Sequence, residues 1–384
     1  MRPITHIADL RAIAQRKLPR AIFDFIDRGS YDEITMNANR SDLDSLRLRQ
    51  RVMVDVSKRS LATNIVGERA TMPIAIAPAG LTGLVHGDGE ILAARAAQAI
   101  GVPYCLSTMS ICSIEDVHAA VKKPFWFQLT VMKDREFSKS LIERAKQAGC
   151  SALVLTLDVQ ARAQQHLDIK NGLGVPPRLT ISNALDMATK PMWVLRVLAG
   201  KRKAFGNLEG HLAGGKNIKH YATWIGDQLD PSLTWRDIAW VRNLWPNKLI
   251  LKGVLDSEDA RLAVNSGADA IIVSNHGGRQ LDSASSSIAA LPAIVDAVGD
   301  RIEVLFDGGV RSGQDVLKAL AVGAKSCLVG RAFLYGLGAM GEEGVRIAFE
   351  ILRKELDVGM ALTGVSDVNA VARSVLMPPR SVAI

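Results

Sequence analysis

From residue 71 onward the chain repeats one pattern: a short apolar run, a polar or glycine-bearing tip, and then an amphipathic helical segment. The runs are short and mostly apolar, which is typical of buried parallel strands. They cover residues 73–77, 102–106, 125–129, 152–157, 248–251, 270–273, 303–306 and 325–329. Eight such runs alternating with helices favour a closed barrel over an open sheet. We therefore predict an α/β protein with a (β/α)8 TIM barrel fold, whose strands lie within about residues 71–335.

Two segments fall outside this repeat. Residues 4–28 carry apolar residues at helical spacing on both sides of Pro19, which predicts two N-terminal helices that cap the barrel. Residues 159–247 follow the fourth strand and are far longer than an ordinary connection, which predicts a long insertion over the barrel mouth. Because 384 residues can bury one large core, we predict a single domain over residues 1–384.

Residues 191–205 of the insertion join an apolar segment to the basic cluster Lys201, Arg202 and Lys203. This composition suits a lid, a partner surface or an interfacial membrane anchor, and it also suits a helix packed on its own domain with a solvated basic tip.

Charge and cysteine content exclude some classes of protein. Lys and Arg number 47 against 39 Asp and Glu, a formal net charge of +8, but the basic residues are scattered, so we predict no nucleic-acid partner. The four cysteines lack C-x-x-C and metal-ligand spacing, which predicts buried thiols in a reducing compartment and no metal site. The N-terminus has no apolar signal region and no run is long enough to span a bilayer, which favours a cytoplasmic protein.

Polar or glycine residues stand at the ends of nearly all the predicted strands. In a parallel barrel the carboxyl ends of the strands meet at one face, where active sites form. Core packing would not require polar side chains at that end of so many strands, so we predict a ligand site there. The residues are Pro78, Ala79, Gly80, Ser107, Thr108, Gln128, Thr156, Asp158, Lys252, His276, Arg279, Asp307, Gly330 and Arg331.

The end of the strand at residues 270–273 carries the most chemistry. His276 can act as a base near neutral pH, and Arg279 can bind a carboxylate through two parallel hydrogen bonds. Asp158 could hold His276 in one tautomer and stabilise its protonated form. Lys252 ends an apolar strand and could stabilise negative charge on a cofactor ring. These residues also have purely structural interpretations. His276 could be an ordinary loop histidine beside two glycines, and Asp158 and Lys252 could form ordinary salt bridges at the barrel rim.

The last two strand ends predict a phosphate site. Glycine-bearing turns before a helix let backbone N–H groups face an oxyanion, and arginines add charge-assisted hydrogen bonds. The alternative is that these glycine-bearing turns only connect a strand to a helix and bind nothing. The residues are Asp307, Gly308, Gly309, Arg311, Gly330 and Arg331.

Several long motifs resemble those of the FMN-dependent 2-hydroxy acid dehydrogenases and oxidases. They lie at residues 127–129, 251–254, 274–282 and 307–311, and the resemblance extends from residue 18 to residue 376. Residues 245–249 and 330–335 are most similar to the bacterial membrane-associated L-lactate and mandelate dehydrogenases of this family. The resemblance implies that His276 is the active-site base, Asp158 its partner and Arg279 the clamp for the substrate carboxylate. It also implies that Lys252 lies at the N1/O2 edge of the flavin.

The resemblance implies FMN as the cofactor and a set of residues that would bind it. The isoalloxazine and ribityl contacts would come from Ala77, Pro78, Ala79, Gly80, Ser107, Gln128, Thr156 and Ser274. The ribityl and phosphate contacts would come from Asp307, Gly308, Gly309, Arg311, Gly330 and Arg331.

The implied reaction is oxidation of a 2-hydroxy acid to the 2-keto acid, after which the flavin passes electrons to quinone or oxygen. Gly80 stands where family oxidases often carry Ala, which favours a dehydrogenase that reacts slowly with oxygen. The resemblance also implies a homo-oligomer, with a tetramer favoured. Residues 191–205 would allow peripheral contact with the inner membrane.

Three positions depart from the family pattern. Phe25 and Thr130 stand where the family has substrate-binding tyrosines, and Gln165 stands where it has an arginine. Each lost donor would weaken a small polar acid by about 1–3 kcal/mol, so a larger or more apolar substrate is favoured over lactate. The alternatives are the same barrel acting on a noncanonical amino or hydroxy group, or an FMN-binding protein without turnover.

Overall fold

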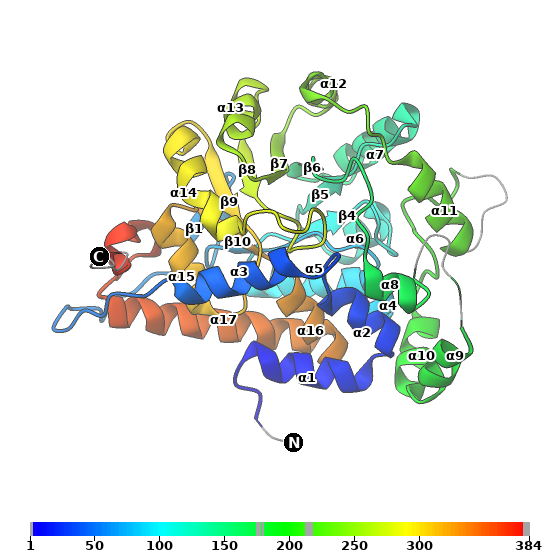
Figure 1. Ribbon diagram of the computed structural model, residues 1–384, viewed down its shortest axis with the longest axis horizontal. Helices are drawn as coiled ribbons and strands as arrows, with labels where there is room; N and C mark the ends of the chain where they lie inside the picture. The colour runs from blue at the N-terminus through cyan, green and yellow to red at the C-terminus, as the bar shows by residue number, and fades with distance from the viewer. Residues whose placement is uncertain (1–2, 174–177, 179, 212–217, 379–384) are drawn as a thin grey trace.

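The computed structural model describes the chain except residues 1–2, 174–177, 179, 212–217 and 379–384 (Figure 1). Each predicted apolar run contains or overlaps one strand of the central sheet. These strands are β3 (Ile74–Ile76), β4 (Cys105–Ser107), β5 (Trp126–Leu129), β6 (Ala152–Thr156), β7 (Lys248–Val254), β8 (Ala270–Val273), β9 (Glu303–Phe306) and β10 (Ser326–Val329).

Within the described residues the eight strands are parallel and hydrogen-bonded in the order β3-β10-β9-β8-β7-β6-β5-β4. Ile76 also pairs in parallel with Tyr104, and its N–H donates to the Pro103 carbonyl at 2.9 Å, which joins β3 to β4 and closes the ring. The predicted (β/α)8 barrel is therefore confirmed. β7 continues past its predicted end through a register shift between Lys252 and Val254, and Gly253 within it has a φ of 102°.

A β-hairpin that the sequence did not reveal closes the amino-terminal end of the barrel. It consists of β1 (Thr63–Ile65) and β2 (Glu68–Ala70), and its Ile65 and Val66 join the residues that fill the barrel interior. Val66 N–H donates to Glu303 at 2.9 Å, and Trp126 Nε1 donates to Glu68 at 2.6 Å. Because this end is filled by the hairpin, the opposite end is left for ligands. Strands of three residues are too short for a periodicity signal.

The outer layer consists of helices that follow the strands. They are α4 (Thr82–Val85), α5 (Gly89–Ile100), α6 (Ile114–Ala120), α7 (Arg135–Gln147), α12 (Trp235–Leu244), α13 (Ser257–Asn265), α14 (Ser287–Val298), α15 (Gly313–Val322), α16 (Arg331–Met340) and α17 (Glu342–Thr363). The predicted N-terminal helices are α1 (Ile7–Lys17) and α2 (Arg20–Asp27), and Pro19 lies at the start of α2. A third helix, α3 (Ile34–Ser45), drawn in blue in Figure 1, packs against α14 and α15.

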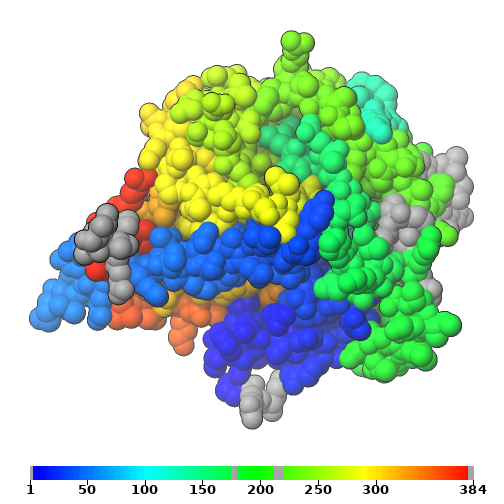
Figure 2. Space-filling view, viewed as in Figure 1, coloured from blue at the N-terminus to red at the C-terminus, as the bar shows by residue number. Residues whose placement is uncertain are grey.

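The insertion after β6 carries α8 (His166–Lys170), α9 (Ile181–Ala188), α10 (Pro191–Ala199), α11 (Ile218–Gln228) and α12. Helices α9 and α10 pack beside α2 and α4, and Trp193 Nε1 on α10 donates to the Leu84 carbonyl at 2.9 Å. They form the lower right corner of the molecule in Figures 1 and 2. Among the described residues, none from α9 or α10 lines the cavity at the carboxyl ends of the barrel strands that is described below.

The basic cluster at residues 201–203 is used inside the chain. Lys201 Nζ pairs with Asp116 at 2.6 Å, and Arg202 pairs with Asp116 as well. Lys203 Nζ donates to the last carbonyl groups of α10, including that of Val197 at 3.1 Å. The basic tip is therefore paired within the chain: Lys201 and Arg202 with Asp116, which is distant in sequence, and Lys203 with the end of the preceding helix α10.

The four cysteines are free and buried, as predicted. Across the part of the chain that the structure describes, no helix is both long and apolar enough to cross a bilayer. No cluster of His, Cys, Asp or Glu side chains suited to a metal ion occurs among those same residues.

Candidate active site

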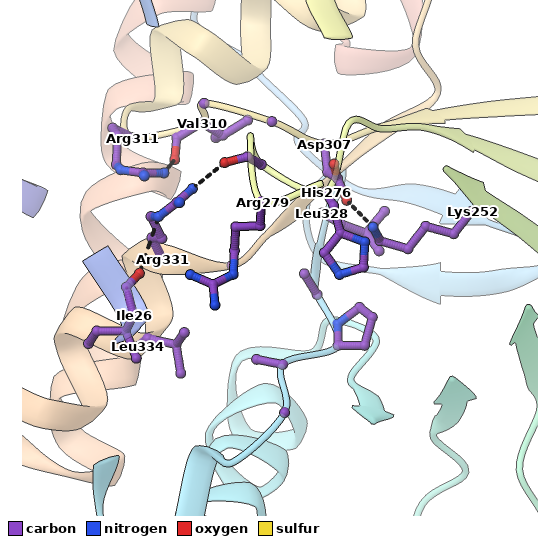
Figure 3. A pocket seen from close by; sticks show the side chains of 18 of the residues that line it. Ile26, Lys252, His276, Arg279, Asp307, Val310, Arg311, Leu328, Arg331 and Leu334 are labelled. Carbon is purple, nitrogen blue, oxygen red and sulfur yellow. Dashed lines mark hydrogen bonds and ion pairs between the residues drawn. The ribbon is translucent and has the colours of Figure 1, made fainter. Parts of the chain in front are cut away.

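A cavity of about 150 Å³ lies at the carboxyl ends of the barrel strands, where the sequence placed the ligand site. Figure 3 shows His276 and Arg279 at its centre, Lys252 and Asp307 at one end, and Arg311 and Arg331 at the other. The predicted residues that line it are Phe25, Ala77, Pro78, Ala79, Gly80, Lys252, His276, Arg279, Asp307, Gly308, Gly309, Arg311, Gly330 and Arg331.

The turn after β8 holds His276 in an uncommon backbone conformation. His276 has a φ of 58°, and the glycines after it have φ values of 65° and 72°. A left-handed backbone is unfavourable for a residue with a side chain and persists only where its surroundings enforce it. The amides of Asn39 and Asn275 exchange hydrogen bonds of 2.9 and 2.8 Å, and Gly278 N–H donates to Asn275 at 3.1 Å. These bonds fix the turn that presents the imidazole to the cavity.

Asp158 from the end of β6 pairs with His276. The imidazole Nδ1 lies 3.1 and 3.2 Å from the two carboxylate oxygens. Burial acts to raise the pKa of Asp158, but His276 and Lys252 outweigh it and the pKa is lowered, so the carboxylate is ionised. A carboxylate at Nδ1 favours the tautomer that leaves Nε2 unprotonated. Within the described residues Nε2 has no hydrogen-bond partner, and it is therefore available as a base.

Arg279 is anchored by the end of α2. Its Nη1 donates to the carbonyls of Phe25 and Arg28 at 2.7 and 2.8 Å, and its guanidinium stacks over the Phe25 ring at 5.0 Å. Burial lowers the pKa of Arg279, and Asp168, 3.8 Å from Nη2, acts in the opposite direction. A buried guanidinium with its plane fixed and little acidic neutralisation is suited to a ligand carboxylate.

Of the three residues that depart from the family pattern, only Phe25 lines the cavity. Gln165 lies behind Arg279, where its amide donates to Asp168 at 2.7 Å and accepts from Arg279 Nη2 at 3.3 Å. Burial raises the pKa of Asp168. Thr130 is buried and accepts a hydrogen bond of 2.9 Å from Gln128. Gln165 and Thr130 therefore contact residues of the site rather than the cavity itself.

Neighbouring strand ends carry a buried polar row. The Gln128 amide accepts from Ser107 at 3.0 Å and donates to Thr156 at 2.9 Å. Lys252 Nζ donates to Ser274 at 2.8 Å and lies 3.2 Å from Asp307. Ser107, Gln128, Thr156 and Ser274 do not line the cavity directly.

Lys252 is a charged group inside the barrel end. Burial acts to lower its pKa, but Asp307 and Asp158 outweigh burial and raise it, so the ammonium keeps its charge. It can stabilise negative charge on a group bound in the cavity.

The other end of the cavity is suited to a phosphate and a hydroxylated chain. Burial lowers the pKa of Arg331 to about 10, and the charge of the nearby Arg311 adds to this effect. An anion between the two arginines would relieve their repulsion. Asp307 Oδ1 is buried and has no hydrogen-bond partner among the described residues, so it can accept from a ligand hydroxyl. A Cβ added at Gly330 would meet only Ala77, at 4.0 Å, so the backbone there is open to a ligand. These observations fit FMN.

Some site features had no sequence signal. Ile26, Val310, Leu328 and Leu334 also line the cavity, and they are apolar residues without a chemical signature. The carbonyl groups of α2 that hold the two site arginines are likewise invisible in the sequence, because every residue has a carbonyl. Arg331 donates to Ile26 and Arg28 carbonyls at 3.2 and 2.9 Å. Only the arrangement of α2 against the barrel reveals this role.

Comparisons with known proteins agree with this site. The family described as FMN-dependent dehydrogenase matches residues 14–378. The L-lactate dehydrogenase of Caulobacter vibrioides is 46% identical over 374 residues, covering 97% of each chain. That of Pseudomonas aeruginosa is 46% identical over 378 residues, covering 97% of this chain and 98% of the relative. The crystal structure of monotopic membrane protein (S)-mandelate dehydrogenase superimposes with a TM-score of 0.93 at 36% identity, covering 98% of this chain and 100% of the other.

These findings confirm the predicted FMN cofactor and the predicted enzyme class, a flavin-dependent dehydrogenase. Lactate and mandelate are both 2-hydroxy acids, so the names of the relatives are consistent with the predicted reaction. The match covers nearly the whole length of the chain and of its relatives. The chain belongs to the FMN-dependent dehydrogenase family.

Proposed function

We propose that this protein oxidises the hydroxyl group of a 2-hydroxy acid to a keto group and passes the electrons from FMN to a quinone. The observation that carries the proposal is the pairing of a base with an anion clamp in one cavity. His276, held by Asp158 at 3.1 Å, and the buried Arg279 both line this cavity at the strand ends. A 2-hydroxy acid needs one group for its carboxylate and another for its proton.

Each of these residues has a separate task. Arg279 binds the substrate carboxylate and, through its hold on the α2 carbonyls, fixes the orientation of the substrate. His276 Nε2 takes a proton from the carbon or oxygen of the CH–OH group, and Asp158 stabilises the resulting imidazolium. Phe25, Leu328 and Leu334 contribute apolar surface to the cavity, which limits water near the reacting atoms. FMN, when bound, accepts the two electrons.

The cofactor would be held from both ends of the cavity. Lys252 would supply positive charge to the flavin ring, and Asp307, Arg311 and Arg331 would bind the ribityl chain and phosphate. The backbone of residues 77–80, 308–309 and 330 would approach the ligand closely, and the row formed by Ser107, Gln128, Thr156 and Ser274 would contact the ring edge.

The substrate is proposed to carry a larger or more apolar side chain than lactate. Support comes from Phe25, whose ring lines the cavity without a hydroxyl group, and from the neutral amide of Gln165 behind Arg279. Relative to the family pattern, the first difference removes a hydroxyl group and the second removes a positive charge, and both groups would favour a small acid. The alternative substrate is a different metabolite, on whose amino or hydroxy group the same barrel would act.

The protein is further proposed to form a single domain, to assemble into a homo-oligomer, and to lie in the cytoplasm at the inner membrane. Support for membrane contact comes from the apolar side chains that α9 and α10 expose and from the similarity to a monotopic membrane protein. A membrane location would bring the flavin close to quinone. Gly80 lines the cavity at a position where oxidases of the family often carry Ala, and this supports a dehydrogenase.

The test is anaerobic mixing of the FMN-loaded protein with a panel of 2-hydroxy acids of increasing side-chain size. We expect the flavin absorbance to bleach with at least one acid and His276→Asn to abolish bleaching while FMN stays bound. A panel that leaves the flavin oxidised would contradict the proposal. For the acceptor, the substrate-reduced enzyme is mixed with air or with a soluble quinone, and faster reoxidation by air would identify an oxidase.

A further inference from the structure

Helices α9 and α10 present an exposed apolar face. Met192, Leu195 and Leu198 follow one another at a spacing of three residues and therefore lie near one side of α10. Trp193 points the other way and docks α10 on the Leu84 carbonyl. Contiguous apolar exposure of this kind marks an interaction surface. The exposed fractions are 83% for Ile181, 66% for Leu185, 59% for Met192, 60% for Leu195 and 64% for Leu198.

A cavity of about 370 Å³ adjoins this face, between the end of α1, the residues after α4 and the start of α10. Within the described residues, its Lys and Arg side chains have no carboxylate partner. Two of them donate instead to backbone carbonyls, Lys17 to Ala339 at 2.6 Å and Lys190 to Arg16 at 2.7 Å. The Lys and Arg side chains that line the cavity are Arg16, Lys17, Lys190 and Arg196.

The nearby acidic side chains are engaged elsewhere. Asp186 accepts from the Arg20 N–H at 2.6 Å, and Asp88 accepts from the Lys201 N–H at 2.6 Å. Burial lowers the pKa of Lys17, and the charge of Arg196 adds to this effect. The cations around the cavity therefore repel one another without a neutralising group of their own, and a bound anion would be stabilised there.

We propose that this cationic cavity binds the phosphate-bearing headgroup of an anionic phospholipid, while the exposed face of α9 and α10 enters the adjacent apolar layer. The inference deepens the membrane contact proposed above and rests on it. A lipid is favoured over free phosphate because Met192 belongs both to the cavity lining and to the exposed apolar face, so the two surfaces are continuous. Cytoplasmic leaflets are rich in anionic lipids that attract such basic groups.

The test uses the FMN-loaded full chain and vesicles of phosphatidylcholine alone or mixed with phosphatidylglycerol. We expect the wild type to bind the mixed vesicles more tightly. Lys190→Gln combined with Arg196→Gln should weaken that binding roughly 30-fold, since each cation near an anionic surface contributes about a factor of five. The matched control is Lys122→Gln combined with Lys123→Gln, two exposed lysines between α6 and β5. Retained FMN absorbance and turnover with a soluble acceptor show that each variant is folded.

A second pair of variants tests the apolar face separately. Leu195→Gln combined with Leu198→Gln should weaken binding to both kinds of vesicle, whereas Val358→Gln combined with Leu362→Gln, two exposed positions on α17, should not. Equal binding of the wild type to both vesicles, or unchanged binding by the Lys190/Arg196 variant, would overturn the headgroup site but leave the membrane contact standing. Absence of vesicle binding would overturn both. Stabilisation of the wild type by inorganic phosphate without vesicle binding would identify a free-anion site instead.

Discussion

Replacing Asp158 by Asn tests how the carboxylate supports the base. The change keeps the shape and an acceptor oxygen near His276 Nδ1 but removes the negative charge now 3.1 Å away. Two charges about 4 Å apart interact by about 4 kcal/mol at an effective dielectric constant near 20. Since about 1.4 kcal/mol corresponds to a factor of ten, losing the stabilised imidazolium should slow substrate reduction by roughly 10²–10³-fold.

The assay is stopped-flow reduction of the flavin under anaerobic conditions, with saturating substrate and with FMN content measured in parallel. Asp168→Asn is the matched control, because this buried carboxylate lies near Arg279 rather than beside His276. It should change substrate binding more than it changes the rate of reduction. A reduction rate for Asp158→Asn within about threefold of the wild type would refute the argument, because such a change is below 1 kcal/mol.

The pH dependence of the same pair has a defined sign. The folded-state pKa of Asp158 is lowered from 3.8, so the stabilisation by this carboxylate is present above 3.8 and is lost as the pH falls through the folded value. The stability of the protein and its reduction rate, measured upward from pH 5, should therefore show no titration of Asp158. If a carboxylate does titrate in that range and Asp158→Asn removes the titration, this assignment is contradicted.

Three further outcomes are expected. Phe25→Leu should weaken binding of the 2-keto acid product about 5- to 30-fold, because it removes a cation–π contact of roughly 1–2 kcal/mol with Arg279. Phe25→Tyr keeps the ring and is the control. Equal product affinities of the two variants, measured from flavin difference spectra, would contradict a role for this contact. Lys252→Met should shift the flavin potential to a more negative value and leave Asp307 unpaired, and an unchanged potential in a reductive titration would remove Lys252 from the ring edge. Glu90→Leu should lower the free energy of unfolding by about 3 kcal/mol or more, because the buried carboxylate accepts from three backbone N–H groups; an unchanged melting temperature would show that water replaces it.

The sequence alone determined the architecture and the location of the site. Burial imposes a local periodicity, so each apolar run predicted one strand and Pro19 predicted the break between α1 and α2. Because all strands of a parallel barrel point the same way, polar residues that followed the runs had to meet at one end. His276, Arg279, Lys252 and Asp307 could therefore be placed in one cavity before any contact was known.

Only the tertiary structure decided which groups are paired, because pairing depends on residues distant in the chain. It placed Thr130 and Gln165 behind the cavity rather than in it, and it used the α2 carbonyls to hold Arg279. The basic residues are the clearest example of this dependence on distant partners. The cluster at residues 201–203 is paired within the chain, whereas Lys190 and Arg196 of the same insertion meet the end of α1 around an open cavity. Charge along a sequence is local, but its neutralisation is set by the partners that folding brings near.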